Sequence, residues 1–272
     1  MSGVSGVVPD GLDASLLLLR HGETEFLVER RFQGRSETPL SPLGRRQAEL
    51  AGDRIAHPGR PPALPVPEGP PRFVAHSPLL RTTDMATAVS TALDAAGATG
   101  VPLIAEPGLV EIHQGAWEGL YQEEVARRYG PELAAWRRRP REAHAPGGEP
   151  LDAVDARVRA GVAPLLDTLA FGREPGTLDR PHVIGYGSAA RGTAHGTPWG
   201  VLVGHDGCFK VLLLALLELP LDAFWRLPFA LAGISVVEIR GGRASLRLHN
   251  AVDHLSDLAE TPVAPDRVAG GL

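Results

Sequence analysis

LLLLRHGET, residues 16–24, is the stretch that decides the fold of this chain. Four consecutive leucines bounded by polar residues predict a short buried strand. In open α/β sheets, ligands bind outside the carboxyl ends of the strands, so Arg20 and His21 are expected at a binding edge. Gly22 allows close approach of the backbone there. On this segment alone, a strand that ends in a surface ion pair of Arg20 is an equal alternative.

Two further apolar runs are each followed by a basic or imidazole side chain. Phe73–His76 leads into Ser77-Pro78, which predicts a helix with Ser77 as N-cap, Pro78 at its first position and Arg81 in its first turn. The run 201–204 ends in His205 and an apolar helix candidate over 209–217. If the three strands are neighbours, two guanidinium groups and two imidazoles converge without a carboxylate among them. Such a set predicts an anion site that suits phosphate best.

The remaining patterns alternate between helix and strand. Helices are predicted over 42–55 (with Ser41 as N-cap), 79–96, 122–129, 132–139 and 151–171, a strand over 102–105, and a terminal hairpin over 234–240 and 244–249. This order predicts the α/β class, with a single three-layer α/β/α domain around a mostly parallel sheet. We expect a flexible tail at 1–13, a proline-rich surface loop at 57–72 and a C-terminal tail at 259–272.

About thirty residues, the insertion 172–200, separate the last long helix from the next strand, where a few residues are usual. Within it, Gly185-x-Gly187-x-x-Ala190 matches a dinucleotide-binding fingerprint. That fingerprint requires a following helix, which Gly192, Gly196 and Pro198 interrupt, so a flexible or oligomer-forming insertion is the preferred interpretation.

The composition of the chain argues against several classes of function. The formal net charge of −5 gives no basic field that would attract nucleic acid. The single cysteine, Cys208, excludes an intrachain disulfide framework and fits a reducing compartment, so a cytoplasmic location is expected. No apolar run approaches the roughly 20 residues that a membrane helix needs, and no signal peptide is recognisable. No clustered Asp, Cys and His spacing suggests a metal.

The motifs, taken together and in their order, resemble the histidine phosphatase superfamily (the phosphoglycerate mutase-like, branch 1 group). The resemblance runs through Leu19–Thr24, Arg31–Gly34, Pro39–Ala48, Ser77–Thr82, Glu111–Gly119, Pro146–Glu149, Gly204–Gly207 and Asn250–Leu255. It implies a phosphoglycerate mutase-like domain over 14–258.

The resemblance also implies the roles of individual residues. His21 matches the nucleophile that carries a phosphohistidine intermediate, and Glu111 matches the general acid and base. Arg20, Arg81 and His205 would neutralise the phosphoryl oxygens, with His205 also counted as catalytic. Gln33 and Gly34 would line the phosphate site. No metal and no cofactor is implied, and a homodimer stays open.

Four positions depart from the family pattern. Leu27 and Leu231 stand where relatives often carry Asn, Asp206 where many have Gly, and Lys210 where many have Arg. The loss of one donor at Leu27 would reshape the phosphate pocket or weaken its affinity.

The pattern Arg31-x-Gln33-Gly34 with Pro39-Leu40-Ser41 favours the phosphatase side of the family. We therefore expect a metal-independent phosphomonoester hydrolase that acts on a small phosphorylated metabolite. A phosphoglycerate-type phosphomutase and a phospho-ligand binding protein without turnover are the alternatives.

Residues 111–149 are expected to fold over the pocket. The arginines Arg127, Arg128 and 137–139 would contact an anionic substrate tail, or, as the preferred interpretation, form a solvated helix face. The side chains of Trp117, Tyr121 and Trp136 would line an apolar part of the pocket or pack in the core.

Overall fold

A computed structural model describes residues 6–170 and 196–258 of the chain. The elements follow the order β1 (Ala14–Arg20), α1 (Glu25–Val28), α2 (Pro42–Ala56), β2 (Val74–His76), α3 (Leu80–Ala95), β3 (Leu103–Ala105), α4 (Gln122–Arg128), α5 (Gly130–Arg138), α6 (Leu151–Ala170), β4 (Trp199–Gly204), α7 (Asp206–Leu216), β5 (Ile234–Arg240) and β6 (Arg243–Ala251). Four short 3₁₀ helices lie at Pro107–Leu109, Gly115–Trp117, Leu221–Arg226 and Asp253–Leu258.

The strands form one mixed sheet in the order β3-β2-β4-β1-β5-β6. β3, β2, β4 and β1 are mutually parallel, and β5 and β6 extend the sheet with antiparallel pairs. The predicted class, a mostly parallel α/β sheet with helices on both sides, is confirmed. β1 and β2 lie on either side of β4, so the carboxyl ends of all three meet at one edge.

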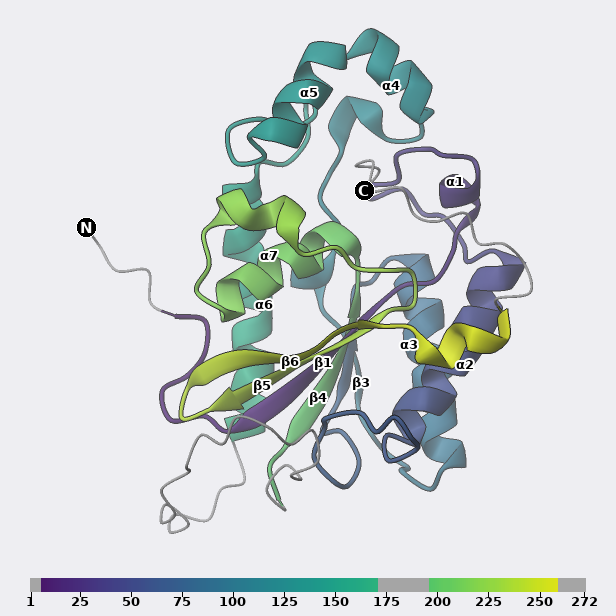
Figure 1. Cartoon of the computed structure of the whole chain (residues 1–272), viewed down its shortest axis with the longest axis vertical. Coiled ribbons are helices and arrows are strands. Elements are labelled where there is room, and N and C mark those ends of the chain that lie inside the picture. Colours follow the sequence, from purple (N-terminus) through teal and green to yellow (C-terminus); the bar gives the residue numbers. More distant parts are fainter. Residues whose placement is uncertain (1–5, 171–195, 259–272) are drawn as a thin grey trace.

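The leucine run of β1 is buried because both faces of the sheet are covered. Leu16 and Leu18 belong to a core cluster with residues of α6 and α7, whereas Leu17 and Leu19 belong to a second cluster with residues of α2 and α3. Successive side chains of a strand point to opposite faces, so a strand between two helix layers must be apolar at every position. Figure 1 shows this arrangement, with α6 and α7 on one side of the sheet and α2 and α3 on the other.

The N-terminal tail expected at 1–13 is wrong for the part that the structure describes. Val7 and Leu12 are buried in the first core cluster. The backbone N–H of Gly242 donates to the carbonyl of Leu12 at 2.9 Å, and that of Gly241 donates to Asp13 Oδ1 at 2.6 Å. The apolar side chains and the turn between β5 and β6 therefore anchor this segment, and residues 1–5 lie outside the described residues.

The C-terminal boundary predicted for the insertion 172–200 is wrong. Trp199 and Gly200 belong to β4, where they pair with Ser15 and Leu16. A side chain on Gly200 would lie 2.4 Å from the ring of Phe73, so this strand position requires glycine. Residues 171–195, with the expected dinucleotide fingerprint, and the C-terminal tail 259–272 lie outside the described residues.

The proline-rich loop 57–72 contains no regular element, as expected, but its location is partly wrong. Leu64 and Val66 are buried in the second core cluster rather than lying on the surface. Burial of these two apolar side chains fixes an otherwise irregular segment.

Two helix starts also differ from the prediction. α7 begins at Asp206 rather than at 209, and α3 begins at Leu80, with Leu79 as its N-cap. Both differences arise from side chains that serve the candidate site, described below. No helix within 6–170 or 196–258 is both long and apolar enough to cross a membrane.

Candidate active site

The predicted residues converge at the carboxyl edge of the parallel strands. Arg20 ends β1, His21 follows it, and His205 follows β4, which pairs with β1 along its whole length. Arg81 comes from the first turn of α3, after β2. All four side chains are buried, and the rings of His21 and His205 lie 5.2 Å apart.

His21 is held as a neutral imidazole with one free nitrogen. Its Nδ1 lies 2.7 Å from the carbonyl of Gly22, which can only accept a hydrogen bond, so Nδ1 carries the proton and Nε2 keeps its lone pair. Burial lowers the pKa of His21 well below its ordinary value of 6.5, and the charges of Arg81 and Arg20 lower it further. A neutral imidazole with an available Nε2 is the form that can act as a nucleophile.

His205 is the second neutral imidazole of the site. Its Nε2 lies 2.8 Å from Ser77 Oγ, while its Nδ1 is buried without a hydrogen-bond partner in the described part of the chain. Burial lowers the pKa of His205 below 6.5, followed by the charge of Arg81. Ser77 is therefore not the N-cap that the sequence predicted, because its hydroxyl serves His205 and the helix starts three residues later.

The two arginines are held by backbone carbonyls rather than by carboxylates. Arg81 donates to Ser36 O at 2.9 Å and to Gly34 O at 2.8 Å, and Arg20 Nη1 donates to Phe229 O. The Nε atoms of both are buried with no hydrogen-bond partner in the described part of the chain. Burial lowers the pKa of Arg81 to about 10, which still leaves it charged at neutral pH. Two oriented cations without hydrogen-bonded counter-ions favour an anionic ligand.

Glu111 lies in the loop after the 3₁₀ helix 107–109 and faces the start of α7. Its carboxylate accepts backbone hydrogen bonds from Ile112 at 2.8 Å, Gly207 at 3.1 Å and Cys208 at 3.0 Å. This distant carboxylate satisfies the first N–H groups of α7, so the helix starts earlier than a local cap would predict. Burial raises the pKa of Glu111 above its usual value of 4.5, and the charge of Asp206 adds to the rise.

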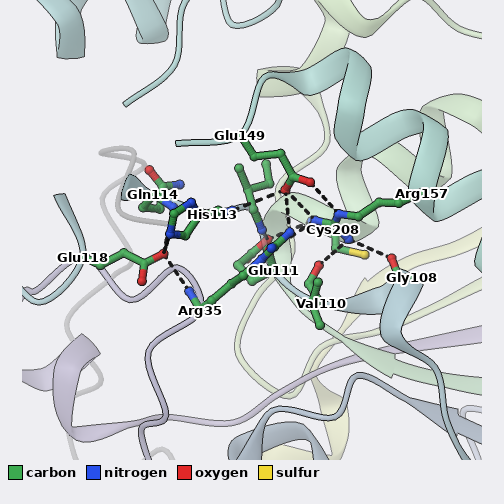
Figure 2. A network of polar contacts seen from close by, with 11 residues as sticks. Arg35, Gly108, Val110, Glu111, His113, Gln114, Glu118, Glu149, Arg157 and Cys208 are labelled. Carbon is green, nitrogen blue, oxygen red and sulfur yellow. Dashed lines mark hydrogen bonds and ion pairs between the residues drawn. The ribbon is translucent and has the colours of Figure 1, made fainter. Parts of the chain in front are cut away.

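Three charged residues fix the backbone on which Glu111 sits. This Glu149 cluster consists of Arg35, Glu149 and Arg157 (Figure 2). Arg35 Nε and Arg157 Nη2 both donate to the carbonyl of Glu111, at 3.1 and 3.2 Å. Arg157 Nη1 also donates to the carbonyls of Gly108 and Val110 at 2.8 Å each.

Glu149 holds the two guanidinium groups of this cluster together. It accepts from Arg157 at 2.9 and 3.0 Å and from Arg35 at 3.0 Å. Burial alone would raise the pKa of Glu149, but the hydrogen bonds and charge of Arg157, with the charge of Arg35, lower it overall. The two guanidinium groups of the cluster therefore share one carboxylate, in contrast to the arginines of the pocket.

Gln33 and Gly34 support the site from the loop that follows α1. Gln33 Oε1 accepts from the hydroxyls of Thr24 and Thr38 at 2.7 Å each, which leaves its amide NH₂ as the donor side. Gly34 has a φ of +51° and offers its carbonyl to Arg81. A side chain at Gly34 would lie 2.2 Å from Glu118, so the loop can take this course only with glycine.

The residues proposed for substrate contact divide into core and surface. Trp117 and Trp136 are buried in the first core cluster, as the packing alternative predicted, whereas Tyr121 is exposed and stacks under Arg31 at 3.9 Å. Arg128 pairs with Glu124 on α4, and Arg139 pairs with Glu142 in the exposed turn that follows α5. In Figure 1, α4 and α5 form a lobe at the same end of the molecule as α1.

Sequence reasoning missed the residues that hold the others in place. These are Ser77, Phe229 with its carbonyl, and the Glu149 cluster. Glu149 was noted as part of a motif, but no sequence signal pairs it with Arg35 or Arg157, because the partners are far apart along the chain. Cys208 is buried, and its pKa is raised to about 12 by burial, so its thiol is protonated and not a nucleophile. Among the described residues, no group of three or more His, Cys, Asp and Glu is placed to hold a metal ion.

Comparison with known proteins links this geometry to a family. Residues 16–170 and 188–252 match the model of the histidine phosphatase superfamily (branch 1). A bifunctional protein of Mycobacterium tuberculosis is 32% identical over 246 residues, which cover 90% of this chain and 56% of that protein. The chain thus spans little more than half the length of this relative.

Two further matches cover nearly the whole of the related protein. Phosphoserine phosphatase 1 of Hydrogenobacter thermophilus is 27% identical over 242 residues, 89% of this chain and 94% of its own. The solved structure of a mycobacterial glucosyl-3-phosphoglycerate phosphatase with inorganic phosphate has a TM-score of 0.68 and 27% identity. That match covers 89% of this chain and 100% of the solved one.

Proposed function

The chain belongs to the histidine phosphatase superfamily, branch 1, and on that premise we propose that it hydrolyses a phosphomonoester of a small metabolite through a phosphohistidine at His21. The observation that carries this proposal is the charge state of the pocket. A neutral imidazole with a free Nε2 lies beside two buried guanidinium groups whose hydrogen bonds, within the described part of the chain, go to backbone carbonyls and not to carboxylates.

The first step forms the phosphohistidine. His21 Nε2 forms a bond to phosphorus as the bond to the leaving oxygen breaks, and Glu111 donates its proton to that oxygen. Arg20, Arg81 and His205 neutralise the phosphoryl oxygens, with Gln33 and Gly34 supporting the pocket. Charge supplied in advance by oriented groups lowers the barrier without reorganisation during the reaction.

The second step releases inorganic phosphate. The Glu111 carboxylate takes a proton from water, the water oxygen bonds to phosphorus, and the bond to His21 Nε2 breaks. The raised pKa of Glu111 suits both roles, because an acid and base works best with a pKa near the working pH. The arrangement calls for no cofactor, since arginines supply the positive charge.

The relatives point to hydrolysis and to the substrate class. A phosphoserine phosphatase and a glucosyl-3-phosphoglycerate phosphatase are among the proteins similar to this chain. We infer a small anionic phosphate ester as the partner, rather than nucleic acid or membrane, and a cytoplasmic setting. Phosphomutase activity and ligand binding without turnover are the alternatives, and a homodimer stays a prediction.

The test measures inorganic phosphate released from a panel that includes phosphoserine, 3-phosphoglycerate, glucosyl-3-phosphoglycerate and an aryl phosphate. Turnover of at least one member is expected, together with an acid-labile phosphoprotein after rapid quenching. The matched control is His21→Ala, which should leave less than about one per cent of the rate because no other residue can accept the phosphoryl group. Phosphoryl transfer between phosphoglycerates without net release of phosphate would instead support phosphomutase activity. A trapped phosphohistidine without turnover would support a phospho-ligand binding protein.

A further inference from the structure

Asp206 and Lys210 form a buried ion pair that the proposed reaction does not use. They lie one turn apart on α7. Lys210 Nζ lies 2.5 Å from Asp206 Oδ2, and the two residues are only 5% and 8% exposed. A buried ion pair seldom adds stability over apolar residues, so its presence calls for another reason.

The second oxygen of Asp206 leads to the phosphate site. Asp206 Oδ1 accepts from the backbone N–H of Phe229 at 3.2 Å. The carbonyl of the same residue accepts from Arg20 Nη1. Asp206 is therefore connected to Arg20 through a single residue whose two backbone polar groups are both occupied.

Phe229 begins a segment that runs alongside Arg20 and His21. Its ring packs against Phe209 and His249, with centroids 5.6 and 5.1 Å away. Further along the segment, the N–H of Ala232 donates to the carbonyl of His21 at 3.1 Å, and the carbonyl of Gly233 accepts from the N–H of Arg20 at 3.3 Å. The segment 229–233 therefore holds both residues, and Asp206 is the side chain that anchors its first N–H.

This indirect link keeps the charge of Arg20 available. A carboxylate bonded directly to Arg20 would orient it but also neutralise it, and would compete with phosphate. Asp206 is instead neutralised by Lys210, whose Nζ also lies 5.2 Å from the ring of Phe224 and 5.0 Å from that of Trp225. Arg20 is oriented by a neutral carbonyl and retains its full positive charge.

We propose that Asp206 is a positioning residue for Arg20, acting through the backbone of Phe229, and that Lys210 allows its carboxylate to be buried. This inference rests on the proposed function, because it gives Arg20 the task of binding the phosphoryl group. It assigns Asp206 no proton transfer, since both of its oxygens are engaged.

The test compares two double variants that differ in a single hydrogen-bond acceptor. Asp206→Asn with Lys210→Met removes both charges but keeps an oxygen for the N–H of Phe229. Asp206→Ala with Lys210→Met removes both charges and the acceptor. Neither variant leaves a buried charge unpaired, and any influence of the Asp206 charge on Glu111 is lost equally in both. Circular dichroism and thermal melts verify that both are folded.

Titration calorimetry with orthovanadate and with inorganic phosphate gives the decisive readout. The Ala double variant should bind both anions about tenfold more weakly than the wild type, the loss expected for one orienting hydrogen bond. The Asn double variant should stay within about threefold of wild type. The kcat/KM of alkyl and aryl phosphates should fall by the same factor in the Ala variant, because Arg20 contacts the phosphoryl group and not the leaving group.

The outcomes separate this inference from the proposed function. Equal anion affinities for the two double variants, whether strong or weak, would overturn the positioning role of Asp206. A difference between the two double variants that is larger for alkyl than for aryl phosphates would also overturn it, since that pattern belongs to Glu111. If the wild type binds neither anion, the proposed function itself fails, and this inference with it.

Discussion

The Glu149 cluster and the candidate active site use arginine in opposite ways. In the cluster, Arg35 and Arg157 both bond to the carboxylate of Glu149 at 2.9–3.0 Å, so one counter-ion is shared between two guanidinium groups. In the pocket, Arg20 and Arg81 are held by backbone carbonyls, so their charge is oriented but not neutralised. From this difference we infer that the acceptor, not the arginine, decides whether the group serves as a structural contact or is available to an anion.

Glu111 lies between these two regions, and its removal should give the largest effect. Glu111→Gln should slow alkyl phosphates by about 10²–10⁴, because their leaving oxygen needs a proton. An aryl phosphate, with a better leaving group, should show a burst of the aryl alcohol followed by slow release of phosphate. Stopped-flow and steady-state assays of both substrates test this.

Equal losses for both substrates without a burst would show that Glu111 only positions the phosphate. The Glu149 cluster would then hold a phosphate-positioning residue in place and not the general acid and base. Asp206 is a poor substitute as proton donor, since it is paired with Lys210.

Disruption of the Glu149 cluster should have an intermediate effect on activity. Arg157→Met removes one of the two donors to the carbonyl of Glu111 and both donors to the preceding loop. We expect kcat for alkyl phosphates to fall about 10- to 100-fold, since a displacement of the order of 1 Å costs that much. Aryl phosphates should lose less in the burst phase.

Arg157→Lys sharpens this test because lysine keeps the charge but lacks the planar fork. If the geometry of the guanidinium group matters, the kcat of Arg157→Lys for alkyl phosphates should be as low as that of Arg157→Met. If only the positive charge matters, its kcat should equal that of the wild type. Arg46→Met removes an exposed arginine paired with Glu49 and serves as the matched control without effect.

The two regions should also respond differently to acid. The pKa values of His21 and His205 are lowered in the folded state, so below pH 6.5 the unfolded chain binds protons that the folded chain does not. Stability is therefore retained above pH 6.5 and lost as the pH falls, by about 1 kcal/mol per histidine over the first unit. Glu149, with a lowered pKa, stays charged over this range and adds no such dependence.

Urea unfolding at pH 7.0 and 5.5 measures this loss, to which His21 and His205 together contribute about 2 kcal/mol. His21→Asn should remove about half of it. A loss that is the same in the wild type and in His21→Asn would show that the pocket does not carry the pH dependence.

Removal of metal should have the smallest effect. Arg20 and Arg81 supply the positive charge in the pocket, so turnover should stay within experimental error after exhaustive EDTA treatment. Loss of activity that Mg²⁺ or Zn²⁺ restores would mean metal-assisted transfer, and would contradict the role assigned to the free arginine charges.

Much of the site could be predicted from local sequence. Arg20, His21 and His205 directly follow apolar strands, and strand ends in a parallel sheet meet at one edge. Ser41 was correctly predicted as the N-cap of α2. Ser77 stood in the same Ser-Pro context but bonds to His205 instead. The two motifs share Ser-Pro-Leu, and the partner of Ser77, His205, comes from the end of the neighbouring strand β4.

By itself, the sequence determined the elements, their two-sided burial and the edge where the polar residues gather. These features can be predicted because they depend on apolar patterns within short stretches of the sequence. The tertiary structure alone decided which oxygen each charged side chain meets: Phe229 for Arg20, Glu149 for Arg157, the start of α7 for Glu111. Hydrogen bonds act over about 3 Å, and that distance is set only when segments remote in sequence pack together.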